Sequence, residues 1–88
     1  MPVDCWVISG NTQEMYESTE WVSCVVMSEI IADVVCNQRK QLFHQAYYRG
    51  GVHMLTIQQM KEIDPAYDAD YDMNESVIWT YKKVQLFT

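Results

Sequence analysis

The residues best suited to chemistry are carboxylates gathered in the last third of the chain. Half of the twelve acids lie within residues 62–75, with no base among them, and they are Glu62, Asp64, Asp68, Asp70, Asp72 and Glu75. Three of these aspartates alternate, so in an extended segment their carboxylates share one face at a spacing of roughly 6.6–6.8 Å. Carboxylates this close repel one another and are stabilised by water, a cation or a basic surface.

Calcium is one ligand that such a row could bind. The D-x-D-x-D spacing of residues 68–72 is the spacing that opens an EF-hand loop. Met73, however, occupies the position where that loop requires glycine, and Trp79 the position of its bidentate glutamate. We therefore predict no metal site in this segment.

For residues 64–75, the acidic connector, a solvated loop is the plainest interpretation, and a protein contact is the functional interpretation on which our predicted site rests. Carboxylates arranged in a row can bind Lys or Arg clusters of a partner, and tyrosines are common anchors of such interfaces. A second candidate patch, Tyr47, Tyr48 and Arg49, lies at the end of the predicted long helix and consists of residue types that are common in protein interfaces. The predicted partner-binding residues are Asp64, Tyr67, Asp68, Asp70, Tyr71, Asp72, Glu75, Tyr47, Tyr48 and Arg49.

The cysteines and histidines predict neither a metal site nor a nucleophile. Cys5, Cys24, Cys36, His44 and His53 match no zinc-binding spacing. Cys36 and His44 are eight residues apart on one predicted helix, about 12 Å along its axis, which is too far for a hydrogen bond. The sequence also has no phosphate-binding glycine loop and no catalytic motif such as HExxH or GxSxG. We expect no catalytic residues and no cofactor.

The formal net charge of −6 over 88 residues disfavours direct binding of DNA or RNA, whose backbones are also negative. No apolar run approaches the roughly 20 residues of a membrane span. Pro2 and Asp4 argue against a signal peptide, and three cysteines without a CxxC pair suit a reducing compartment. We expect one cytoplasmic domain over residues 1–88.

A long amphipathic helix over residues 28–49 is the element that must position these groups. Ser28 suits its N-cap, and Gly50 and Gly51 suit its end. On a 3.6-residue period its apolar stripe, interrupted by Gln38, consists of Ile30, Ile31, Val34, Val35, Leu42 and Ala46. The opposite side carries Glu29, Asp33, Asn37, Lys40 and His44. We expect the apolar stripe to pack on a small sheet.

Shorter elements complete an α+β fold. Residues 3–9 predict a strand ended by Gly10 and Asn11, and residues 20–27 favour a doubly buried strand over a backward extension of the helix. Thr56 and Gln59 form a capping box that favours a short helix over residues 56–64, with a strand over 52–59 as the alternative. Residues 76–87 alternate as a strand whose phase change at Lys82 and Lys83 predicts a bulge or turn. The fold is then an antiparallel sheet of three to four strands on one long helix, with a second short helix.

These features favour a small acidic protein–protein interaction module, an inhibitor or adaptor that binds a basic surface of a macromolecular partner. A row of carboxylates can mimic phosphates, as in a virus- or mobile-element-encoded inhibitor of a nucleic-acid-handling complex. The alternative is an assembly protein that forms a homodimer or larger homo-oligomer through its C-terminal strand, since an exposed strand edge can pair with its own copy.

Overall fold

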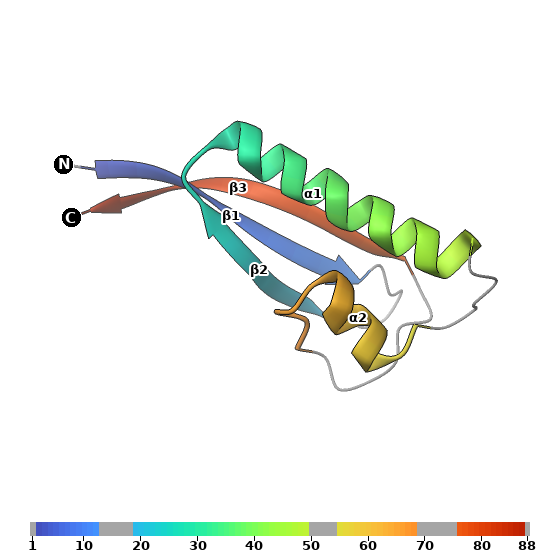
Figure 1. Ribbon diagram of the computed structural model, residues 1–88. Coiled ribbons are helices and arrows are strands. Elements are labelled where there is room, and N and C mark those ends of the chain that lie inside the picture. The colour runs from blue at the N-terminus through green and yellow to red at the C-terminus, as the bar shows by residue number, and fades with distance from the viewer. Residues whose placement is uncertain (1, 13–18, 50–54, 69–75, 88) are drawn as a thin grey trace.

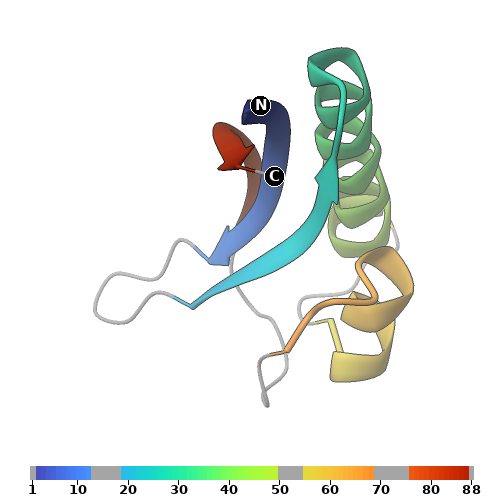
Figure 2. The same ribbon diagram turned by 90° about the vertical axis from the view of Figure 1, so that its left-hand side faces the viewer.

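Three antiparallel strands form a sheet, and the two helices lie on the same side of it (Figure 1 and Figure 2). The computed structural model describes residues 2–12, 19–49, 55–68 and 76–87. The strands are β1 (Pro2–Thr12), β2 (Glu20–Val26) and β3 (Val77–Phe87), in the order β2-β1-β3. The helices are α1 (Glu29–His44), which continues as a π-helical turn η1 (Gln45–Arg49), and α2 (Ile57–Ile63). The predicted α+β fold is confirmed.

The central strand β1 is longer than predicted, because Gly10 and Asn11 lie inside it rather than after it. Gly10 is opposite Trp21 of β2 in the ladder, and the Trp21 indole lies directly over its backbone. A Cβ at position 10 would be 2.3 Å from Cζ2 of that ring, a distance at which something must shift. Glycine is therefore needed here for close packing, not for a turn.

Strand β2 is confirmed, but it is not buried on both faces. Trp21 points into the core, whereas Val22 and Val25 are exposed on the opposite face of the sheet. An irregularity in its pairing with β1, between Ile8 and Ser9, leaves one extra residue in β2.

Strand β3 pairs with β1 from Pro2↔Phe87 to Thr12↔Val77 without a register shift, so the predicted bulge or turn at Lys82 and Lys83 is wrong. The phase change has another cause. The N-terminal end of β1 and the C-terminal end of β3 continue past the start of α1 (Figure 1). Tyr81 lies beside Glu29 at that start, so Lys83, two residues further along the same face, lies beyond the helix. The Lys83 ammonium lies 3.4 Å from the Asp4 carboxylate of β1.

The short helix α2 begins as predicted. The Thr56 hydroxyl accepts a hydrogen bond from the Gln59 amide at 3.2 Å, and the Gln59 side chain accepts one from the Thr56 amide at 3.0 Å. Asp64 and Pro65 follow the last turn, so the helical alternative for this region is confirmed over the strand.

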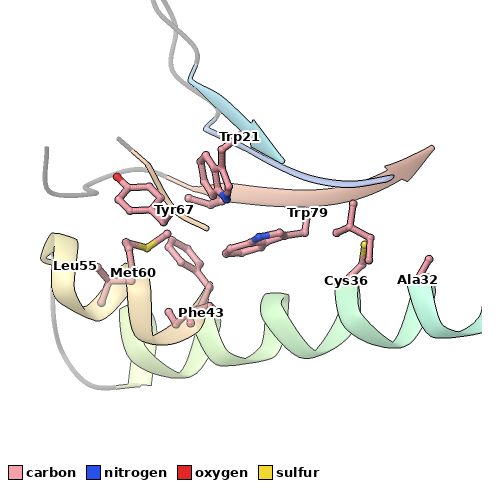
Figure 3. Packing of buried hydrophobic residues seen from close by; sticks show 11 residues of the cluster. Trp21, Ala32, Cys36, Phe43, Leu55, Met60, Tyr67 and Trp79 are labelled. Atoms are coloured by element: carbon pink, nitrogen blue, oxygen red, sulfur yellow. The ribbon is translucent and has the colours of Figure 1, made fainter. Parts of the chain in front are cut away.

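The core lies between the sheet and the two helices and is rich in aromatic rings (Figure 3). Trp21 packs edge-on against Tyr67 and Trp79, with ring centroids 4.9 and 6.3 Å apart. Phe43 of α1 contacts Trp79 at 6.0 Å. The buried residues of this core are Ile8, Trp21, Ala32, Cys36, Phe43, Leu55, Met60, Ile63, Tyr67, Val77 and Trp79.

The predicted packing face of the long helix is wrong. The residues of α1 that are buried are Ala32, Cys36 and Phe43, and Val35 and Ala46 are only partly buried. Ile30, Ile31, Val34 and Leu42, which were expected to close the sheet, are all exposed. The sheet already carries bulky tryptophans, so the helix packs on it through the small Ala32 and Cys36 together with Phe43. Ile30, Ile31 and Val34 are left exposed.

Candidate protein-binding surface

Asp64 was predicted to contact a partner, but its side chain is completely buried, at 0% exposure. Its Oδ2 accepts hydrogen bonds from the indole N–H groups of Trp21 and Trp79, both at 2.9 Å. Its Oδ1 accepts one from the Ala66 amide at 3.1 Å. The carboxylate thus connects β2, β3 and the turn after α2, and it is an internal structural group rather than a contact residue.

Arg39 of α1 completes this network. Its Nε lies 3.9 Å from Asp64 Oδ2 and donates a hydrogen bond to the Ser23 hydroxyl at 3.1 Å, and its Nη1 donates one to the Ile63 carbonyl. Burial by itself raises the pKa of Asp64, but the hydrogen bonds from the two indoles and the Ala66 amide outweigh it, so the pKa lies below its usual value. The carboxylate is therefore stabilised in its charged form.

The rest of the acidic connector divides into two groups. Tyr67 is also in the core, at 2% exposure, so it cannot anchor a partner, whereas Asp68 is exposed. Asp70, Tyr71, Asp72 and Glu75 lie outside the described residues. Asp68 is thus the one predicted connector contact, among the described residues, that lies on the surface.

At the end of the long helix, Tyr47 is half-buried and stacks on Phe43, with centroids 5.4 Å apart. It therefore covers the end of the core. Tyr48 and Arg49 belong to η1, and their side chains lie outside the described residues.

The structure instead exposes an apolar surface on the outer side of α1. Ile30 is 78% exposed and Val34 57%, and these two residues are one helical turn apart, with Ile31 beside them. Glu29 and Asp33 are exposed at its margin. We call Ile30, Ile31 and Val34 the outer face of α1.

The sheet face away from the helices is a second apolar surface. Val22, Val25, Ile78 and Leu86 are exposed on it, and no described element covers this face (Figure 2). These four residues come from β2 and β3, and along β3 polar residues such as Thr80 and Lys82 lie between them on the same face.

The Asp64 network and the outer face of α1 were both missed from sequence. The indole N–H groups gave a partial signal, since a buried tryptophan needs an acceptor and the chain has three tryptophans. The outer face gave none, because an apolar helical stripe normally predicts burial.

No group of three or more His, Cys, Asp or Glu side chains within the described ranges is arranged to hold a metal ion. Among the same residues, no helix has the length and apolar character to cross a membrane. No family model, curated protein or solved structure matches this chain.

Proposed function

We propose that the protein is an interaction module, an inhibitor or adaptor of a macromolecular partner. It binds by inserting the outer face of α1 into an apolar groove with a basic rim. The observation that carries this proposal is the exposure of Ile30, Ile31 and Val34 on a helix whose buried side is made of smaller residues and one phenylalanine. Exposed apolar patches rimmed by polar residues are typical of protein-binding sites.

The spacing of the outer face supports this mode of binding. Anchors at positions i and i+4 are how amphipathic helices enter grooves, and Ile30 and Val34 have that spacing. The helix backbone is held by the core side of α1, so the anchors are presented already ordered and binding costs little conformational entropy.

The charges near the outer face favour a basic rim on the partner. Glu29 and Asp33 flank the anchors, and the chain carries a net charge of −6. Such charges accelerate encounter and select partners, whereas the buried apolar contacts provide most of the affinity.

The test is affinity capture from cell lysate with three forms of the tagged protein. The helix variant Ile30→Gln/Val34→Gln removes the anchors, and the matched control Val22→Gln/Val25→Gln removes two similarly exposed apolar side chains from the sheet face. We expect the wild type and the control to capture the same partner, and the helix variant to lose it by at least tenfold. Equal capture by all three forms would contradict the proposal.

A second pair of variants examines the charges. Asp33→Asn is expected to weaken capture several-fold at low salt and much less at high salt, because salt screens exposed charges. Asp68→Asn, in the acidic connector, is expected to have no effect. If Asp68→Asn weakens capture and the helix variant does not, the contact lies in the connector instead.

A further inference from the structure

Strand β3 has a free edge. It pairs with β1 on one side, and no described strand pairs with its other side. The edge is long for an unpaired one, at 11 residues, and the strand contains neither proline nor glycine. An edge of this kind presents backbone N–H and C=O groups that can pair with another strand.

The lysines of β3 do not by themselves block such pairing. Lys83 is 3.4 Å from Asp4 within its own chain, so its charge is partly compensated. In an antiparallel pair of two copies related by a two-fold axis at Thr80, Lys82 is opposite Ile78 and Lys83 is opposite Val77. Lysine therefore never faces lysine in this register.

The side of α1 next to β3 carries charges in a self-complementary order. Asp33 and Lys40 are exposed on this side, with Cys36 and Asn37 midway between them. If a second copy of α1 runs antiparallel about that midpoint, each Asp33 meets the Lys40 of the other copy. The same surface in the parallel orientation would bring like charges together.

Thr80 of β3 and the midpoint between Asp33 and Lys40 of α1 line the same surface pocket. A surface pocket of about 460 Å³ lies between residues 33–40 of α1 and residues 77–81 of β3, and both Asn37 and Thr80 line it. Tyr81 of β3 lies next to α1, where partial desolvation and the neighbouring Glu29 and Asp33 raise the pKa of its hydroxyl. One two-fold axis near Thr80 therefore passes close to the midpoint between Asp33 and Lys40 of α1.

The distance between the two α1 helices of such a pair also fits. Among the strands, α1 packs mainly against β3 and β1. A helix centred above that strand pair lies two strand spacings, roughly 9–10 Å, from its copy across the joined edges, which is the usual packing distance of two helices.

We propose that two copies of this chain form a dimer by antiparallel pairing of their β3 edges, giving a six-stranded sheet with two antiparallel α1 helices on one face. Asp33 of each copy pairs with Lys40 of the other. This dimer goes beyond the proposed interaction role. It uses the side of α1 next to β3, which borders the outer face at Ile30 and Asp33.

The test is the mass in solution over a concentration series, by sedimentation equilibrium, for the full chain of 10.4 kDa. We expect the wild type to approach twice that mass. Asp33→Lys and Lys40→Glu are each expected to weaken the dimer about tenfold, because the two-fold axis applies each change twice. The double variant Asp33→Lys/Lys40→Glu restores opposite charges and should restore the wild-type mass.

The matched control is Gln38→Lys, which adds a charge to α1 away from β3. Circular dichroism is expected to be the same for all variants, since every changed residue is exposed. A monomeric wild type at all concentrations would overturn the proposal. A dimer that the single charge reversals leave intact, or that the double variant fails to restore, would overturn the assigned interface.

Discussion

The two sides of α1 reverse the usual relation between hydrophobicity and burial. The inner side buries Ala32 and Cys36 with Phe43, and it also brings Arg39 to the buried Asp64. The outer side exposes two isoleucines and a valine. Steric fit, not hydrophobicity, determines which residues the inner side carries, because a sheet lined by Trp21 and Trp79 leaves room for small residues and for one charged network.

The largest expected effect is the loss of the Asp64 carboxylate on the inner side. Asp64→Ala leaves two indole N–H groups without their acceptor and Arg39 without its nearest acid, so the free energy of unfolding should fall by roughly 3–5 kcal/mol. Urea denaturation measures it. Asp68→Ala, four residues further on and exposed, is the control and should change the free energy by no more than about 0.5 kcal/mol. Similar values for the two variants would contradict an internal role for Asp64.

The second-largest expected effect is destabilisation by a larger side chain between α1 and the sheet. Ala32 is 0% exposed, so Ala32→Leu must displace its neighbours and should destabilise the fold by about 1–3 kcal/mol. Val34→Leu on the outer side adds one methylene in solvent and should be nearly neutral. Thermal or urea unfolding of both variants compares the two sides directly. A neutral Ala32→Leu would mean that the inner side is not closely packed.

These two positions show how far sequence can predict this fold. The strands, the capping box at Thr56 and the extent of the long helix follow from local patterns, since each depends on neighbouring residues. The rotation of α1 does not, because it depends on which side chains the sheet presents to it. Gly10 shows the same limit, since it was predicted to end the first strand and is in fact the site within that strand on which Trp21 packs.

The candidate site was predictable to a smaller extent. The acidic connector was correctly identified as unusual, but Asp64 and Tyr67 are buried by contacts with tryptophans from distant strands. Composition cannot distinguish a carboxylate that accepts internal hydrogen bonds from one that awaits a partner. Only the tertiary contacts separate Asp64 from Asp68.

A smaller effect is expected from acid. The pKa of Asp64 is lower in the folded than in the unfolded chain, so its charged form stabilises the fold fully above the unfolded value of about 3.9. That contribution is lost as the pH falls through the lower folded pKa. The difference in unfolding free energy between the wild type and Asp64→Asn should therefore be constant near neutral pH and shrink below about pH 3.9. A difference that grows on acidification would contradict the direction of the shift.

The smallest expected effect is on the outer face. Ile30→Gln removes an apolar side chain that is 78% exposed, so the unfolding free energy should change by no more than about 0.5 kcal/mol. Ala32→Gln, two residues away on the inner side, is the matched variant and should cost several times more, because it buries an amide without partners. The measurement is urea denaturation at two protein concentrations. If Ile30→Gln proves as costly as Ala32→Gln, the outer face is covered in the folded protein. A cost that rises with protein concentration would identify the cover as a second copy, because only association makes stability depend on concentration.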